Sequence, residues 1–169
     1  MTPLLCVLAS KPHARIDTPW LYHKTTRREV YEAARASSPV TLPSCYAKRV
    51  GDGVPCCVAC ACVQCQVFDV LCWNERDEVT EFTIGNVVVE VPAASQGSSN
   101  PKPAATRLVT PPIRAGCLPG VMREQLLHEG IIEEAPVRVE DVLVPGRRVW
   151  LVNSVRGWVP VQVVSTAPR

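Results

Sequence analysis

The sequence predicts an α/β fold built on a mixed sheet, and three observations favour that class. Short apolar runs with strand character alternate with segments of helical pattern along the 169 residues. The length suits one domain with a substantial core. A composition of 47% apolar and 20% charged residues is typical of a folded globular chain. We therefore expect a single domain over residues 1–169.

Local patterns place the elements of the first half. Residues 2–9 form a short apolar run expected to be a strand, which ends before the Lys11-Pro12 step. Residues 26–37 are rich in helix formers and carry an apolar face, so they predict a helix. A strand over 67–73, a polar turn and a second strand from Val79 then predict a hairpin with a break at Gly85-Asn86.

The second half is punctuated by proline and glycine. Residues 92–107, rich in Ser, Pro, Gly and Ala, are expected to form a flexible loop. Pro119-Gly120 should open a helix that Gly130 ends. Residues 131–144 indicate a short strand plus a turn, and residues 147–164 indicate two strands around a tight turn at Ser154 to Gly157.

A cysteine-rich stretch interrupts this pattern. Seven of the nine cysteines lie between Cys45 and Cys72, and two C-x-x-C units are separated by the single residue Ala61. Zinc ribbons need a longer spacer between such units, and an odd cysteine count argues against a disulfide framework. We interpret residues 44–66 as an insertion and expect no metal site. A small metal-binding protein built on this cluster is the alternative from a different class.

Charge and hydropathy exclude several function classes. A net charge of +2 without a basic block favours neither a nucleic-acid nor a membrane partner. No apolar run reaches the roughly 20 residues of a membrane span. Residues 1–10 lack the basic region of a signal peptide. We therefore expect a cytoplasmic protein.

Lys24 is the first candidate for chemistry. It follows the aromatic residues Trp20 and Tyr22 and precedes the paired cations Arg27 and Arg28. Desolvation and neighbouring positive charge lower the pKa of a lysine, which makes its free amine a nucleophile toward a carbonyl. The alternative interpretation is a partly exposed lysine at a helix start.

Three further places could hold an anionic cofactor. The backbone N–H groups and dipole of the helix start at residues 120–122 favour a phosphate, with Arg123 assisting. The turn at Ser154 and the following amide could bind the same phosphate. Glu81 lies at a strand bend with Thr83 close by. Each of these features alone also has an ordinary interpretation, as a capped helix, a turn serine and a solvated glutamate.

Taken in order, these segments resemble a known family. The motifs are YHKTTRREVYEAAR, LCWNERDEVTEFTIGNVVVE, TPPIRAGCLPGVMREQLLHEGIIEEAPV and VWLVNSVRGWVPV. They are similar to successive motifs of the fold-type IV pyridoxal-phosphate (PLP) enzymes, which include 4-amino-4-deoxychorismate lyase and the branched-chain and D-amino-acid aminotransferases. The resemblance covers residues 17–36 and 67–163. It implies the partly barrel-like large domain of that fold.

The resemblance also implies roles for individual residues. Lys24 is similar to the lysine that binds the cofactor covalently and moves the substrate proton, and Glu81 matches the carboxylate that pairs with the pyridine nitrogen. Arg28 and Asn153 are expected to contact the substrate. The residues expected to contact PLP are Glu81, Gly120, Val121, Met122, Ser154 and Val155.

Departures from the aminotransferase pattern favour the lyase branch. Many aminotransferases of the group carry Thr where this chain has Met122, and Asn153 before Ser154 resembles the lyase pattern. Aminotransferases also place a Tyr shortly after the lysine to bond the cofactor's ring oxygen, where this chain has Glu29 and then Tyr31. We expect elimination of pyruvate to give 4-aminobenzoate. An amino-acid aminotransferase of the branched-chain or D-amino-acid type is the alternative.

The resemblance further implies a domain that this sequence does not show. Family members carry an N-terminal α+β domain, whereas 16 residues precede Asp17 here. We expect that domain to be absent, which makes a truncated, inactive remnant a further alternative. The expected partner is a small amino substrate, and a full-length enzyme is expected to be a homodimer.

Overall fold

The structure, a computed structural model, describes residues 3–12, 29–37, 67–93 and 106–165. Eight strands form one sheet in the order β3-β2-β1-β8-β7-β4-β5-β6. The strands are β1 (Leu4–Leu8), β2 (Val67–Trp73), β3 (Val79–Phe82), β4 (Asn86–Pro92), β5 (Thr106–Thr110), β6 (Glu133–Glu134), β7 (Val149–Asn153) and β8 (Gly157–Val164). The helices are α1 (Glu29–Ser37), η5 (Ile113–Ala115, a 3-10 turn), α2 (Val121–His128) and α3 (Val139–Leu143).

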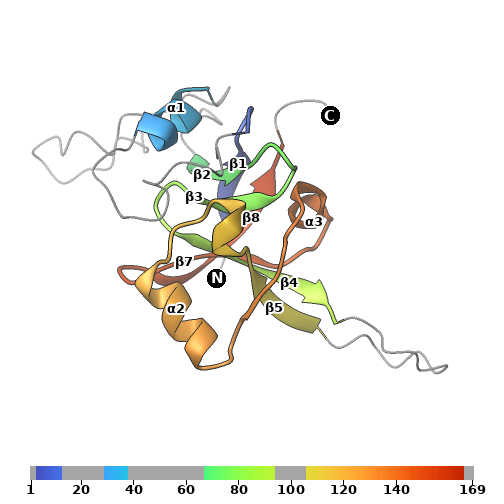
Figure 1. Ribbon diagram of the computed structural model, residues 1–169. Coiled ribbons are helices and arrows are strands. Elements are labelled where there is room, and N and C mark those ends of the chain that lie inside the picture. The colour runs from blue at the N-terminus through green and yellow to red at the C-terminus, as the bar shows by residue number, and fades with distance from the viewer. Residues whose placement is uncertain (1–2, 13–28, 38–66, 94–105, 166–169) are drawn as a thin grey trace, which may run out of the picture.

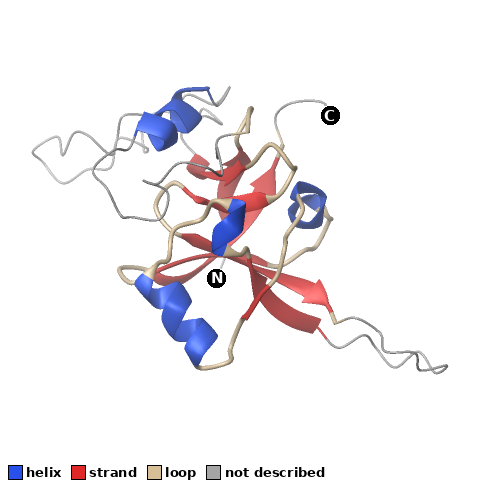
Figure 2. Ribbon diagram, in the orientation of Figure 1, coloured by secondary structure: helices blue, strands red, loops and turns tan. Residues whose placement is uncertain are grey.

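The sheet is mixed, as the sequence predicts. β1 runs parallel to both of its neighbours, β2 and β8, and β5 runs parallel to β6. The other adjacent pairs are antiparallel. The sheet curls into a half-barrel, and the few helices lie at its periphery (Figure 1, Figure 2). This architecture confirms the predicted fold class.

Three apolar clusters hold the helices on the sheet. The largest joins residues of several strands to Val139 and Val142 of α3. A second cluster lies beneath α1 around Ala34. The third joins Leu126 of α2 to Val152 of β7. The apolar faces of α1 and α2 thus fix the position of each helix against its own strands.

Most predicted elements are confirmed within the described residues. The strand expected over 67–73 has those bounds, and the hairpin breaks between β3 and β4 as predicted. Gly130 follows α2 with a φ of 67°, the left-handed conformation that suits a helix stop. The insertion at 44–66 lies outside the described residues, as do residues 94–105 of the loop predicted over 92–107. The two ends of that predicted loop instead belong to strands, Pro92 to β4 and residues 106–107 to β5.

One element was predicted wrongly. Residues 139–143 form the helix α3, where the sequence indicated only a turn after a short strand. The Arg138 backbone N–H donates to the Asp141 carboxylate at 2.8 Å, which stabilises the helix start. A helix of five residues is too short for its apolar spacing to show in the sequence. No helix in the described ranges is long and apolar enough to cross a bilayer.

Candidate functional site

A buried carboxyl group lies at the centre of the candidate site. Glu81, in β3, is 4% exposed. Its Oε1 accepts a hydrogen bond from the Tyr31 hydroxyl at 2.5 Å. Its Oε2 accepts hydrogen bonds from the Leu118 backbone N–H at 3.1 Å and from Asn86 Nδ2 at 3.3 Å. Groups from α1, from β4 and from the segment before α2 therefore fix this carboxyl.

The environment of Glu81 brings its pKa close to neutral pH. Burial raises the pKa of Glu81 to about 7. The hydrogen bonds from Tyr31 and the Leu118 amide, together with the charge of Arg123, act in the opposite direction on this pKa. A cationic N–H group placed against the carboxyl would favour its ionised form. Glu81 can therefore either hold a proton or pair with a positive charge.

Asn86 joins Glu81 to the start of α2. Asn86 is 6% exposed, and its Nδ2 also donates to the Leu118 carbonyl at 2.9 Å. A Cβ atom on Gly120 would lie 2.1 Å from Asn86 Oδ1, which is far inside van der Waals contact. The φ of Gly120 is −72°, which any residue adopts. Gly120 is therefore required by this close approach and not by its backbone conformation.

The start of α2 is open to solvent. Its N-cap residue Gly120 makes no side-chain capping hydrogen bond, and Val121 is 74% exposed. Met122 is partly buried in the cluster beneath the helix. The first backbone N–H groups of a helix have no acceptor within the helix, so the amides of Val121 and Met122 can receive an anion.

Arg123 does not assist at that helix start, contrary to the sequence-based expectation. It is 1% exposed and points into the fold. Its Nη2 donates to the Pro111 carbonyl at 2.9 Å and pairs with Glu134 at 2.7 Å, and its Nη1 pairs with Glu124 at 2.5 Å. Its role in the described structure is to attach α2 to the β5–β6 region.

The β7–β8 turn contacts the turn between β3 and β4. Asn153 Nδ2 donates to the Ile84 carbonyl at 3.0 Å. Asn153 Oδ1 accepts from the backbone N–H of Val155 at 3.1 Å and of Arg156 at 2.8 Å. Ser154 is exposed and Val155 is 92% exposed. A phosphate would have to take over the Val155 amide from Asn153, so the roles of these residues stay predictions.

The structure brings together three of the predicted segments. Glu81 and Asn86 contact the segment that starts α2, and Ile84 between them contacts the β7–β8 turn. Lys24 and Arg28 lie outside the described residues. Sequence reasoning missed Asn86, whose one signal was its place at the strand break. It also missed the contact of Tyr31 with Glu81, because Tyr31 entered the sequence analysis only as part of a departure from the aminotransferase pattern.

A second buried network ties α1 to the same strands. Arg35 Nη2 pairs with Asp69 Oδ1 at 2.9 Å, and Asp69 is fully buried. Arg35 Nε donates to the Thr83 hydroxyl oxygen at 2.7 Å, and the Thr83 hydroxyl donates in turn to Asp69. Thr83 lies two residues after Glu81. α1 is thus anchored beside the carboxyl that Tyr31 contacts.

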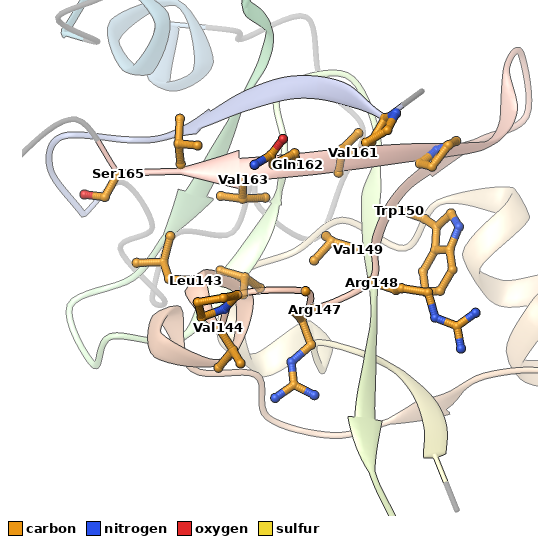
Figure 3. A pocket seen from close by; sticks show the side chains of 16 residues that line it. Leu143, Val144, Arg147, Arg148, Val149, Trp150, Val161, Gln162, Val163 and Ser165 are labelled. Carbon is orange, nitrogen blue, oxygen red and sulfur yellow. The ribbon is translucent and has the colours of Figure 1, made fainter. Parts of the chain in front are cut away.

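A separate apolar cavity of about 690 Å³ lies between β8 and the segment from α3 to β7 (Figure 3). Val142, Val149, Val161 and Val163 are among its lining residues. The cavity shares no lining residue with the contacts of Glu81 described above. In the described ranges, no cluster of three His, Cys, Asp or Glu side chains could hold a metal ion.

Comparison with known proteins identifies relatives of this arrangement. Aminodeoxychorismate lyase of Saccharomyces cerevisiae is 30% identical over 134 residues, which cover 79% of this chain and 30% of the relative. A Mesorhizobium loti structure assigned as an amino-acid aminotransferase has a TM-score of 0.66 at 28% identity, covering 96% of this chain and 60% of that chain.

A third relative shares the fold at lower identity. The 4-amino-4-deoxychorismate lyase of Pseudomonas aeruginosa has a TM-score of 0.62 at 20% identity, covering 97% of this chain and 48% of that one. The chain spans less than two thirds of each of these three relatives. The family profile described as amino-transferase class IV matches residues 7–164. The chain therefore belongs to the class IV aminotransferase family.

Proposed function

We propose that this chain binds PLP, the cofactor on which the class IV aminotransferase family depends, and acts on a small amino-substituted molecule. The observation that carries the proposal is the buried carboxyl of Glu81. It is bonded to the Leu118 amide, two residues before the N-cap of a solvent-open helix. An acid beside an anion-binding helix start offers complementary sites for the two polar ends of PLP.

The residues present fit this cofactor. PLP carries a basic ring nitrogen at one end and a phosphate at the other. A buried carboxyl whose pKa is about 7 suits a protonated ring nitrogen, because pairing with a cation favours ionisation of the acid. The uncapped start of α2 suits the phosphate. Asn86, which contacts both places, holds them in one unit.

Each residue then has a distinct task. When bound, PLP withdraws electrons from the α-carbon of an amino substrate. Glu81 would keep a proton on the ring nitrogen, and the amides of Val121 and Met122 would bind the phosphate. The amine of Lys24 would accept and return the substrate proton, in line with its match to the family lysine.

The reaction we propose is that of a 4-amino-4-deoxychorismate lyase, in which pyruvate is eliminated and 4-aminobenzoate remains. The match to the Saccharomyces cerevisiae lyase over 79% of this chain supports it. Met122 and Asn153 also follow the lyase pattern. Such an enzyme would serve folate synthesis in the cytoplasm. The second candidate is an amino-acid aminotransferase, which the 28% identity to the Mesorhizobium loti protein favours.

The products distinguish these two candidates. Incubation of the purified chain with 4-amino-4-deoxychorismate should release pyruvate and 4-aminobenzoate if the lyase proposal is correct. Formation of a keto acid from an amino acid would instead support the aminotransferase. Family members are generally dimeric, and we propose a homodimer, which light scattering of the eluted protein would test. Absence of both activities would favour the truncated-remnant alternative.

Covalent labelling tests cofactor binding without requiring turnover. The purified chain is mixed with PLP, reduced with borohydride and digested for peptide mapping. The label should lie on Lys24, because reduction converts a lysine linkage into a stable secondary amine, and Lys24→Ala should abolish it. Lys11, Lys48 and Lys102 are controls within the same chain. A label spread evenly over all four lysines would contradict the proposal.

A further inference from the structure

We propose that Tyr31 is a positioning residue for Glu81: α1 is anchored so that the Tyr31 hydroxyl fixes one oxygen of the Glu81 carboxylate. The consequence for cofactor binding rests on the proposed function, whereas the effect on Glu81 itself does not. In this structure the Tyr31 hydroxyl is committed to the acid.

The hydrogen bonds of Glu81 are divided between its two oxygens. Oε1 accepts from Tyr31 at 2.5 Å, and Oε2 accepts from Leu118 N–H and from Asn86. One oxygen is therefore held from α1 and the other from the opposite side of the carboxyl. Without the Tyr31 hydroxyl, the carboxyl would be held only through Oε2 and could rotate about that attachment.

The anchoring of α1 makes this contact specific. Tyr31 and Arg35 are four residues apart on one face of the helix, a rise of about 6 Å. Glu81 lies in β3 and Thr83 is the first residue of the turn that follows it. Tyr31 contacts Glu81, and Arg35 one helical turn later contacts Thr83. The ion pair of partly exposed Arg35 with buried Asp69 attaches the same helix to β2.

Other groups around Glu81 also affect its pKa, but the hydroxyl of Tyr31 lowers that pKa most. Arg123 contributes attraction through its charge. Cys72 and Cys117 are buried thiols whose pKa values are raised, so they carry no charge near neutral pH. Of the influences that lower the pKa of Glu81, the Tyr31 hydrogen bond is the largest, ahead of the Leu118 amide. Loss of the hydroxyl should therefore favour the protonated acid.

The test is a carboxyl titration of the ligand-free chain. Protein labelled with ¹³C at glutamate carboxyls is followed by NMR against pH, and Glu81→Gln identifies the resonance. A hydrogen bond to a charged group corresponds to about one to two pH units, so Tyr31→Phe should raise the Glu81 midpoint by that amount. Thr106→Val is the matched control, because it deletes a hydroxyl that donates to a different carboxylate, Glu90.

A second perturbation keeps the hydroxyl of residue 31 and changes only its strength as a donor. Replacing tyrosine by 3-fluorotyrosine makes the phenol a stronger donor, which should lower the Glu81 midpoint, opposite to the effect of Tyr31→Phe. A midpoint that is unchanged in both proteins, or that moves equally in Thr106→Val, would overturn the proposal. Neither outcome depends on the chain binding PLP.

Titration of PLP by absorbance separates this inference from the proposed function. If PLP binds, Tyr31→Phe should weaken binding several-fold near pH 7.5, and the pH dependence of binding should move by the same interval as the carboxyl midpoint. If Tyr31→Phe binds PLP with the same pH dependence as the parent chain, the positioning role of Tyr31 would be contradicted. A chain that shows the midpoint shift but binds no PLP would support the role of Tyr31 and refute the proposed function.

Discussion

Replacing Gly120 by alanine tests the contact that joins the acid to the helix start. The added Cβ would lie 2.1 Å from Asn86 Oδ1. Since carbon and oxygen atoms do not approach closer than about 3 Å without strain, the Asn86 side chain must move by about 1 Å. Alanine accepts the φ of −72° at this position, so no backbone strain adds to the effect.

The magnitude follows from the hydrogen bonds that Asn86 would lose. Its bond to the Leu118 carbonyl, at 2.9 Å, is a neutral hydrogen bond of about 0.5–1.5 kcal/mol. Its bond to Glu81 is long, at 3.3 Å, so we assign about 1 kcal/mol, below the range for charged groups. Alanine in place of glycine returns about 0.4–1 kcal/mol through the unfolded chain. The net loss of unfolding free energy should be about 0.5–2 kcal/mol.

A double-mutant cycle measured by urea unfolding isolates this contact. Gly120→Ala should be costly in the parent chain. It should be neutral or slightly stabilising in an Asn86→Ala background, because the colliding oxygen is then gone. An equal cost in both backgrounds would refute the packing argument. So would a Gly120→Ala chain as stable as its parent.

Three other predictions concern charge and chain composition. Burial raises the pKa of Glu81 from its ordinary value of 4.5 to about 7. The folded chain should therefore lose roughly 3 kcal/mol of unfolding free energy as the pH rises from 4.5 to about 7. Urea unfolding at several pH values should show a weaker pH dependence of stability in Glu81→Gln. Arg123→Lys should lower the unfolding free energy by about 1.5–3 kcal/mol in the same assay, because lysine cannot donate to all the acceptors of the buried guanidinium. The control is Arg107→Lys, at an exposed ion pair with Glu133, which should change the unfolding free energy by less than about 0.5 kcal/mol. Deletion of residues 44–66 should leave the yield of soluble protein unchanged or improved. A loss of soluble protein on deletion would instead support a metal site in those residues.

The elements predicted correctly are those whose signal is local. The strand at residues 67–73 and the strand resuming at Val79 carry apolar and β-branched residues on either side of a polar turn. α2 follows a Pro-Gly pair and ends before Gly130. In each case the secondary-structure preference of the segment agrees with its packing in the fold. A window of a few residues is therefore sufficient to predict the element.

The contacts that build the site have no such local signal. Tyr31 meets Glu81 across 50 residues of sequence, and Arg35 meets Asp69 across 34. On the helix pattern, Tyr31 is simply one residue of a partly apolar face. Arg123 shows the same limit, because its place in the first turn suggests a solvent-facing cation, whereas the fold brings the Pro111 carbonyl and Glu134 over it.

One part of the site does follow from a local geometry that the sequence encodes. Phe82 and Gly85 form the closing bridge of the β3–β4 turn. Glu81 and Asn86 lie one residue outside this bridge on either side, although β3 and β4 are not neighbours in the sheet. The turn therefore keeps an acid and an amide five residues apart close together, with Asn86 Nδ2 3.3 Å from Glu81 Oε2. Because Asn86 also bonds to Leu118 and packs against Gly120, this single amide couples the protonation of Glu81 to the position of the helix start.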